Sequence, residues 1–323
     1  MMHTQLLTDE FRALSARLGQ DPLQVQGAGG NTSIKSDGVM WIKASGTELA
    51  QAERQNIFVA VDRQAARAEA LELSGDGSCK ATVLDDSVDL RPSIETTFHA
   101  VLDWRVVAHT HSVATLVHAI SPEGRIEALH KLSHLHPVLV PYAKPGLPLT
   151  REIRTRLQKN TQVIILQNHG LVCCGDTVAE TDDLIREVEE RLYLDPCQIN
   201  TTPAATAALD GFAWSEHNWL AKDKRAIALA TAGTYYPDHV VFLGPGLPEE
   251  NRKAGRPVVL RPGEGVMIRK AASTSQKAML RCLSDVFSRL PKDWSAEPIG
   301  AEAEAELLNW DAEKYRQSLA AQT

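Results

Sequence analysis

Apolar residues along the first two hundred positions recur with the spacings of both helices and strands. Phe11, Leu14 and Leu18 fall on one face of a predicted helix over residues 8–18. Short runs of apolar, often β-branched residues predict buried strands between such helices. We therefore expect helices that begin near residues 8, 92, 112, 150 and 177, interleaved with strands at residues 39–43, 57–61, 106–110, 138–140, 163–166 and 171–174.

The polarity of the chain changes at two places that bear on its organisation. Residues 62–90 are polar and acidic with little periodicity, which predicts a surface excursion. Residues 201–209, TTPAATAAL, predict a linker, so we expect one domain over residues 1–200 and a smaller α+β extension over residues 210–323. Within the extension we expect helices over residues 214–232, 273–290 and 302–319, a strand at residues 238–243 and a hairpin at residues 258–268.

The composition is that of an ordinary soluble globular protein, with 43% hydrophobic and 23% charged residues in a chain of 323. The net charge of −7 argues against a nucleic-acid partner. No apolar run is long enough to span a membrane, and the N-terminus shows helical periodicity instead of a signal-peptide pattern. Five scattered cysteines, an odd number, fit a reducing compartment, so a cytoplasmic location is expected.

The strongest candidates for chemistry are His109 and His111, which directly follow the apolar run at residues 106–108. In an extended chain residues i and i+2 point to the same face, so both imidazoles can approach one metal ion. His169 is a candidate third ligand, and Glu95 is a candidate acid or base. Three histidines and a carboxylate that leave one coordination position open are typical of a catalytic metal site.

Two turns rich in small residues can present backbone N–H groups to an anion. Residues 26–33 contain Gly27, Gly29 and Gly30, and glycine lets a backbone approach a ligand closely. Residues 44–47, ASGT, form the second such turn. The first turn lacks the GxGxxG spacing of dinucleotide-binding folds, so a nicotinamide cofactor is not expected.

The remaining histidines predict no second metal site. His130 and His134 have the i, i+4 spacing of a helical pair, but no third ligand lies near them in the sequence, so we expect a solvated or supporting role. In the extension His217 and His239 stand alone and are expected to be structural. The pattern of residues leaves the role of the extension open.

Five short motifs, spread over nearly two hundred residues, carry a resemblance to a known family. They are Gly30-Asn31-Thr32-Ser33, Ser45-Gly46, Pro92-Ser93-Ile94-Glu95, His109-Thr110-His111 and Asn168-His169-Gly170-Leu171. In this order and at these intervals they resemble the class II aldolase/adducin family, which includes zinc-dependent fuculose- and rhamnulose-phosphate aldolases. The segment RPSIET at residues 91–96 is also similar to the aldolase part of bifunctional rhamnulose-phosphate aldolase/alcohol dehydrogenases, although the residues that follow predict no dehydrogenase domain.

The resemblance implies a central mixed β-sheet flanked by helices, assembled as a homotetramer with sites between subunits. It implies that Zn²⁺, or another divalent metal, is held by His109, His111 and His169, and that Glu95 is the acid/base. Residues around the phosphate of a sugar-derived substrate, or its equivalent, would be Gly30, Asn31, Ser45, Gly46 and Ser93. Family aldolases also use a tyrosine from a neighbouring subunit, for which Tyr142, Tyr235 and Tyr236 are candidates.

Two positions bear on which member of the family the chain resembles. The acid/base position holds Glu95, whereas the epimerase branch has aspartate there, which favours aldolase chemistry. Ile94 stands where phosphate-binding aldolases commonly have a second serine, so one hydroxyl donor for a phosphate is missing. Lys43 and Arg91 can replace that donor, or select a carboxylate instead.

The sequence thus predicts a zinc-dependent aldolase that acts on a sugar-derived, phosphorylated or acidic hydroxy-carbonyl compound through a metal-stabilised enediolate. Partial burial is expected to raise the pKa of Glu95, offset by the nearby cation. A decarboxylase, dehydratase or epimerase that shares the enediolate is the first alternative. The second is a non-catalytic, adducin-like interaction module, against which the presence of all three histidines and Glu95 weighs.

Overall fold

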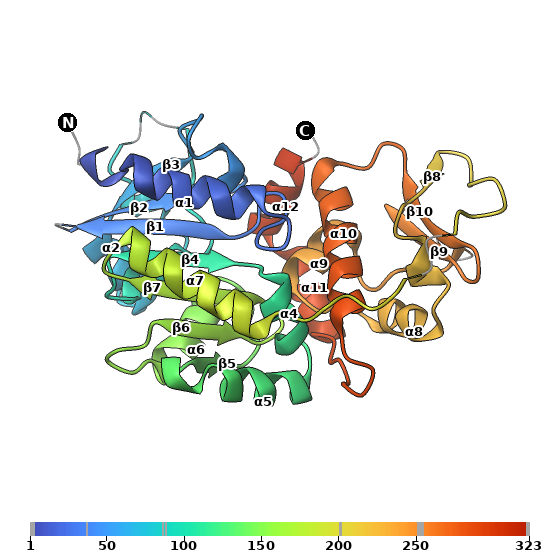
Figure 1. The fold of residues 1–323 in the computed structure, drawn as a ribbon. Coiled ribbons are helices and arrows are strands. Elements are labelled where there is room, and N and C mark those ends of the chain that lie inside the picture. The colour runs from blue at the N-terminus through green and yellow to red at the C-terminus, as the bar shows by residue number, and fades with distance from the viewer. Residues whose placement is uncertain are drawn as a thin grey trace.

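The computed structural model describes residues 4–36, 38–85, 87, 89–199, 202–250 and 255–320. A seven-stranded sheet with the order β3-β2-β1-β4-β7-β6-β5 forms the centre of the N-terminal region (Figure 1). Neighbouring strands run antiparallel except β5 and β6, which are parallel, so the sheet is mixed as predicted. The strands are β1 (Asn31–Ser36), β2 (Val39–Lys43), β3 (Phe58–Asp62), β4 (Val106–Thr110), β5 (Val138–Val140), β6 (Val163–Leu166) and β7 (Gly170–Gly175).

Helices cover both faces of this sheet because its strands are apolar on both sides. Along β4, Val106 and Ala108 belong to the core under one layer of helices, and Val107 belongs to the core under the other. Successive residues of a strand point to opposite faces, so one apolar run supplies two cores. One layer consists of α1 (Asp9–Gln20) and α7 (Val178–Leu192), and the other of α2 (Arg63–Ala70), α3 (Thr96–Val101) and α6 (Leu147–Arg156) (Figure 1).

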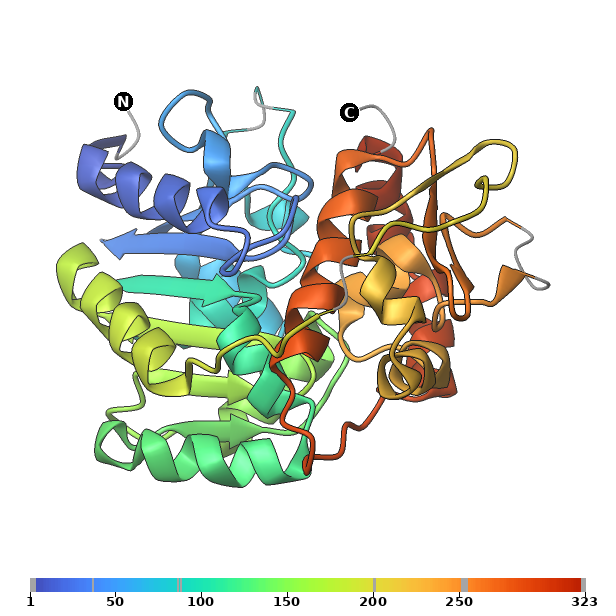
Figure 2. The same cartoon turned by 45° about the vertical axis from the view of Figure 1, so that its right-hand side comes forward.

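The C-terminal region has its own small sheet but shares a hydrophobic core with the N-terminal region. Val113, Leu116, Val117 and Ile120, on or next to α4 (Val113–Ala119), pack in one cluster with apolar side chains from beyond residue 218. Helix α10 (Thr274–Arg289) lies beside α4 at this junction (Figure 2). Helix α5 (Pro122–Lys131) follows α4 and packs against it on the N-terminal side. The other elements of the C-terminal region are β8 (Phe212–Trp214), α8 (Lys224–Ala232), α9 (Pro237–Leu243), β9 (Val258–Arg261), β10 (Gly265–Arg269), α11 (Ala301–Asn309) and α12 (Asp311–Ala320).

Local sequence signals explain where several helices begin. The side chains of Thr8, Ser112, Thr177 and Ser273 each accept a hydrogen bond from a backbone N–H in the first turn of the helix that follows. Such caps satisfy donors that have no partner inside the helix. None of the helices in the described ranges is long and apolar enough to cross a membrane.

Four of the predicted elements are wrong in type or extent. Residues 238–243 form helix α9 instead of a strand, because Pro237 at its first position favours a helix start and the β-branched pair Val240-Val241 packs in a buried helix. Residues 62–90 include helix α2, which Asp62 caps. The predicted helix at 214–232 contains a strand end and a 3₁₀ turn before α8 begins, and the one at 302–319 is divided at Trp310.

Candidate active site

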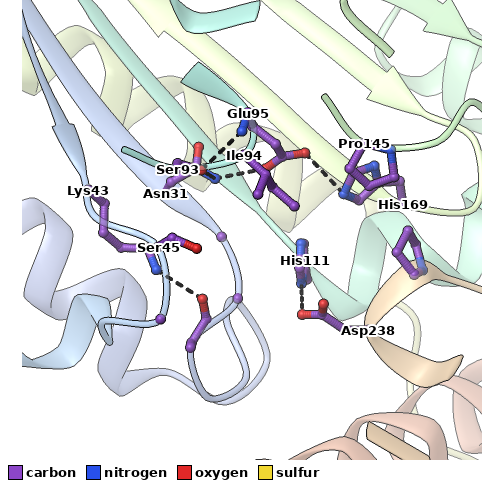
Figure 3. A pocket seen from close by; sticks show the side chains of 15 residues that line it. Asn31, Lys43, Ser45, Ser93, Ile94, Glu95, His111, Pro145, His169 and Asp238 are labelled. Carbon is purple, nitrogen blue, oxygen red and sulfur yellow. Dashed lines mark hydrogen bonds and ion pairs between the residues drawn. The ribbon is translucent and has the colours of Figure 1, made fainter. Parts of the chain in front are cut away.

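The three predicted histidine ligands come together where two neighbouring strands end. His109 lies on β4, His111 follows it, and His169 lies in the turn between β6 and β7. Their candidate ligand atoms all lie within 4.8 Å of one another, and all three side chains are buried. Figure 3 shows the carboxylate of Glu95 facing a ring nitrogen of His169.

The hydrogen bonds of His109 fix which of its nitrogens faces the centre. Its Nδ1 donates to the backbone oxygen of Leu171, on the neighbouring strand β7, at 2.9 Å. The buried Nε2 then carries the lone pair and has no hydrogen-bond partner in the described part of the chain. An unpartnered buried nitrogen is costly unless something binds it, so this ring fits a metal ligand.

The turn that carries His169 is held by its neighbours on both sides. Asn168 adopts a left-handed backbone conformation with a φ of 54°. Its side-chain amide donates to the backbone oxygens of Tyr235 at 2.9 Å and Glu297 at 2.7 Å, both in the C-terminal region. At Gly170 a β-carbon would lie 2.3 Å from the oxygen of Thr110, so only glycine allows this approach to the end of β4. Both regions of the molecule therefore position His169.

Glu95 lies between the imidazoles at the point where helix α3 begins. It occupies the position before the first helical residue, one step outside the helix in which the sequence placed it. Its Oε2 is 3.5 Å from Nε2 of His109, and its Oε1 is 3.4 Å from Nε2 of His169. The side-chain amide of Asn31 donates to Oε2 at 2.8 Å. The carboxylate is thus fixed in orientation while both oxygens face the histidines.

Burial and mutual contacts shift the titration of these groups in a way that suits metal binding. Burial lowers the pKa of His109, and it lowers the pKa of His169 to about 3. Both rings are therefore neutral near pH 7, the state in which imidazole binds a metal. Burial acts to raise the pKa of Glu95, but the contacts with His109 and His169 and the bond from Asn31 lower it below its usual value. Burial thus acts in the expected direction, and the contacts that outweigh it come from neighbours that the sequence did not reveal.

A buried histidine that sequence reasoning did not assign holds Asn31 in place. His99, on α3, forms hydrogen bonds through Nε2 with the side-chain oxygen of Asn31 and through Nδ1 with the hydroxyl of Ser33 at 2.7 Å. Burial lowers the pKa of His99 well below its usual value, so the ring is neutral. The chain of contacts therefore runs from Ser33 through His99 and Asn31 to Glu95.

The residues predicted to surround the substrate line a small inner cavity of about 30 Å³ next to Glu95. Lys43 connects the two turns rich in small residues that line this cavity. Its Nζ donates to the backbone oxygens of Ala28 at 2.9 Å and Thr47 at 2.6 Å. At Gly46, a β-carbon would lie 2.2 Å from Cδ1 of Leu319, so helix α12 packs on this turn. The predicted residues among the lining are Gly30, Asn31, Ser45, Gly46 and Ser93.

Sequence reasoning missed Asp238, which lines the cavity from the C-terminal region. Its Oδ2 lies 3.3 Å from Nδ1 of His111, and the side chain is buried (Figure 3). The first glycine-rich turn passes so close that a β-carbon at Gly29 would lie 2.8 Å from Nδ1 of His111 and 2.9 Å from Oδ2 of Asp238. Helix α9, which carries Asp238, was predicted as a strand, so no spacing argument could have found this carboxylate.

Other candidates do not reach the cavity. Tyr142, Tyr235 and Tyr236 are absent from its lining among the described residues, and the hydroxyl of Tyr235 donates to the oxygen of Leu229 at 3.0 Å inside the C-terminal core. His134 is exposed and pairs with Glu187 at 2.8 Å, away from the cavity.

The donor set fits a divalent cation of the kind that binds imidazole. Three buried imidazoles can supply nitrogen ligands, which leave the charge of the ion uncancelled, and Glu95 and the cavity lie beside them. Such a set is typical of catalytic zinc sites, which keep one position open for water or substrate.

Comparison with known proteins identifies relatives of the N-terminal region. Residues 10–194 match the family described as the class II aldolase and adducin N-terminal domain. The chain is 29% identical over 200 residues to the uncharacterized oxidoreductase YuxG of Bacillus subtilis; this match covers 56% of the chain and only 29% of that relative. It is 26% identical to L-fuculose phosphate aldolase of Methanocaldococcus jannaschii, over 54% of this chain and 87% of that one.

A decarboxylase and a solved structure extend the comparison. The 3-oxo-tetronate 4-phosphate decarboxylase of Escherichia coli is 25% identical over 59% of the chain and 86% of its own length. The N-terminal class II aldolase domain of a conserved protein from Thermoplasma acidophilum superposes with a TM-score of 0.51 at 27% identity, over 59% of this chain and 93% of that one. Together with the family match, these similarities show that the chain belongs to the class II aldolase and adducin family.

Proposed function

We propose that this protein is a zinc-dependent lyase that makes or breaks a carbon–carbon bond beside the carbonyl group of a sugar-derived substrate. The observation that carries the proposal is the position of Glu95, with its two oxygens 3.5 and 3.4 Å from His109 and His169. A carboxylate held against metal-ligating histidines, at the wall of a cavity, can move a proton to or from a substrate carbon. A relative named as an aldolase supports the same reaction class.

The histidines and the cavity residues would have different roles, metal binding and substrate binding. His109, His111 and His169 would hold the metal, which when bound supplies the Lewis-acid charge that stabilises an enediolate. Ser93, at the cavity wall, accepts from the side-chain amide of Asn31 at 3.3 Å, and its hydroxyl hydrogen is placed to bond a substrate oxygen. Because these groups are already fixed by the fold, they do not have to reorganise when charge develops on the substrate.

Glu95 would serve as the base in one direction and as its conjugate acid in the other. In bond formation its carboxylate removes a proton from the carbon beside the carbonyl, and the electron pair left behind bonds to the carbonyl carbon of an aldehyde, whose π electrons move to its oxygen, which takes a proton from solvent. In cleavage the hydroxyl loses that proton and its oxygen re-forms the carbonyl as the carbon–carbon bond breaks. The electrons of the broken bond stay on the carbon, and Glu95 returns the proton. The lowered pKa of Glu95 supplies the carboxylate form at neutral pH.

Decarboxylation is the second candidate, favoured by the similarity to a decarboxylase that acts on an oxo-tetronate phosphate. Loss of CO₂ from a 3-oxo acid breaks a carbon–carbon bond and leaves its electron pair on the carbon beside the carbonyl. The carbon would then take up a proton that Glu95 relays from solvent. Ile94, which lacks the hydroxyl of a serine at the cavity, is compatible with either reaction.

Deuterium exchange tests the shared step without knowledge of the second substrate. The zinc-loaded protein is incubated in D₂O with dihydroxyacetone phosphate, dihydroxyacetone or hydroxypyruvate, and loss of the proton beside the carbonyl is followed by NMR. We expect exchange with one donor, and a fall of about 10²- to 10⁴-fold in Glu95→Gln. Glu53→Gln, an exposed carboxylate away from the cavity, is the control and should exchange like the wild type.

Metal content decides between an enzyme and an interaction module. Elemental analysis of the native protein should find zinc, and Glu95→Gln should retain it. If Glu95→Gln loses the metal, Glu95 is a ligand and the assignment as acid/base is wrong. A native protein that binds no divalent metal would favour the adducin-like module. Light scattering after gel filtration tests the proposed homotetramer.

A further inference from the structure

A larger cleft opens outward from the inner cavity, with which it shares Ser45, Ile94 and Pro145 in its lining. Its volume is about 560 Å³, within the range of small-molecule sites, whereas the inner cavity of about 30 Å³ holds roughly one water molecule. A substrate that reaches the histidines must therefore place most of its length in this outer cleft. The far wall comes from α12 and the residue before it, Trp310, in the C-terminal region.

Two cationic side chains in the outer cleft form cation–π contacts with aromatic rings of the far wall. The guanidinium carbon of Arg91 lies 4.0 Å from the ring centre of Tyr315, and Nζ of Lys144 lies 5.2 Å from that of Trp310. Stacking fixes a cation in place without neutralising it and leaves the N–H donors at its edge available. Within the described ranges neither Arg91 nor Lys144 forms an ion pair with a carboxylate.

The other charges of the outer cleft are matched. Arg151 donates to both oxygens of Glu72, at 2.7 and 2.6 Å. Asp311 pairs with Lys314 at 3.1 Å. Asp76 and Lys80, which both line the cleft, oppose each other in sign and interact electrostatically. The unmatched charge is therefore the positive charge of Arg91 and Lys144, in a chain whose net charge is −7.

We infer that the outer cleft is a subsite for an anionic group at the far end of the substrate, which Arg91 and Lys144 bind while Tyr315 and Trp310 hold them. The inference rests on the proposed function, because it takes the histidines as the place of the other end of the substrate. The substrate class is a polyhydroxylated carbonyl compound with a terminal carboxylate or phosphate. Ile94, at the junction of the two cavities, has no donor for an anion, and the first unmatched donors lie farther out.

This subsite lies partly outside the portion of the chain that defines the family. The family match ends at residue 194, whereas Trp310 and Tyr315 belong to the C-terminal region. The C-terminal region therefore helps to select the substrate through the anionic end group. The motifs of the N-terminal region act on the carbonyl end of the substrate.

A series of acids that differ only in the end group tests the inference by calorimetry on the full chain. Gluconate has a neutral end, glucarate a carboxylate and 6-phosphogluconate a phosphate, and erythronate, tartrate and 4-phosphoerythronate repeat the series at shorter length. We expect one anionic end group to bind about tenfold or more tighter than the neutral end of equal length. Whichever of glucarate or 6-phosphogluconate shows the larger gain identifies the group as carboxylate or phosphate.

Variants locate the preference. Arg91→Met and Lys144→Met keep an apolar stem against the aromatic rings. Each should reduce the ratio of the affinity for an anionic end group to the affinity for the neutral end to near one. Arg151→Met, in the same cleft but already paired with Glu72, is the matched control and should keep the ratio. Thermal unfolding of all three variants checks that the fold is retained. The inference is overturned if the wild type binds the acids with anionic and neutral ends equally well. It is also overturned if Arg91→Met and Lys144→Met leave the preference of the wild type unchanged.

The same ratio is measured in zinc-loaded and metal-stripped protein, which separates the two proposals. If the acids bind without preference for the end group while deuterium exchange occurs, the subsite is wrong and the proposed function stands. If no metal binds and no exchange occurs but the preference for an anionic end persists, the proposed function is wrong and the cleft still binds anions. If none of the acids binds in either form, the inference is overturned.

Discussion

The N-terminal and C-terminal regions contribute to one site in different ways. In the N-terminal region the residues with chemistry, His109, His111 and Glu95, lie in short motifs at the ends of a strand and at the start of a helix. The C-terminal region has no such motif, yet Asp238 contacts His111. Its backbone also accepts both hydrogen bonds from Asn168, which fixes the turn of His169. A region without recognisable motifs can thus complete a site through position alone.

The difference between the regions does not extend to their packing. Leu116 on α4 belongs to the same buried cluster as Tyr235, Val240 and Leu283 of the C-terminal region. A core that includes both regions favours unfolding in a single cooperative transition. The regions are therefore distinct in sequence character but joined in structure, and the following predictions test both halves of that statement.

The largest effect is expected for loss of a metal ligand in the N-terminal region. His169→Ala should weaken zinc binding about 10²- to 10³-fold, because sites with four ligands bind zinc with about 10–16 kcal/mol in total. Chelator competition measures the affinity. His134→Ala, an exposed histidine paired with Glu187, should bind zinc like the wild type. Equal affinities for His169→Ala and His134→Ala would remove His169 from the metal site.

The shared core should give the next largest effect. Leu116, fully buried, lies between the regions, so Leu116→Ala should lower the free energy of unfolding by about 2–5 kcal/mol. Leu73→Ala, at a side chain that is 76% exposed, should change it by less than about 0.5 kcal/mol. Circular dichroism reports on both regions. In a Trp41→Phe/Trp104→Phe background, fluorescence reports on the four tryptophans of the C-terminal region alone. Two separate transitions would contradict the shared core.

A smaller effect is expected for the contribution of the C-terminal region to the metal site. A carboxylate that accepts a hydrogen bond from a ligating imidazole orients the ring, and its loss typically costs 10- to 100-fold in metal affinity. Asp238 lies at such a position, 3.3 Å from Nδ1 of His111, so Asp238→Asn should weaken zinc binding by that factor without unfolding the protein. Asp293→Asn, an exposed aspartate of the same region, is the control. Unchanged affinity in Asp238→Asn would confine the metal site to the N-terminal region.

Particular residues show how far the sequence could predict this structure. The apolar, β-branched run at residues 106–108 predicted a strand, and the two-residue spacing placed His109 and His111 together, because both patterns are local. The mixed sheet and its flanking helices were predicted through the family motifs, and the structure confirms them. Asp238 was missed because its contact with His111 spans more than a hundred residues and its helix was predicted as a strand.

Two further residues, His99 and Glu95, show why the hydrogen bonds and pKa shifts of the site could not be predicted from the sequence. His99 was visible in the sequence, but its hydrogen bonds to Asn31 and Ser33 depend on how α3 docks against β1. The direction of the pKa shift of Glu95 depends on the number of its neighbours, which no spacing in the sequence encodes. Local pattern predicts which elements form, whereas docking between elements decides the hydrogen bonds and charges of the site.

The smallest effect on the metal site is expected for a carboxyl group buried in the N-terminal region, whose titration should change the stability of both regions. Burial raises the pKa of Glu189, on α7, to about 7 from an ordinary value of 4.5. Between these values the folded protein holds a proton that the unfolded chain has released, so stability falls as pH rises from about 4.5 to about 7 and is level above that. Glu189→Gln should remove this fall. It should match the wild type near pH 4, and near pH 8 it should be more stable by on the order of 3 kcal/mol.

The place where this gain is observed bears on the comparison between the regions. Glu190→Gln, at the exposed neighbouring position, should show no such gain. Because the core is shared, fluorescence from the C-terminal tryptophans should report the same shift in the unfolding midpoint as circular dichroism, although Glu189 lies in the N-terminal region. A shift seen by circular dichroism alone would mean that the two regions unfold separately, and that the C-terminal region contributes Asp238 to the site without sharing the stability of the fold that binds the metal.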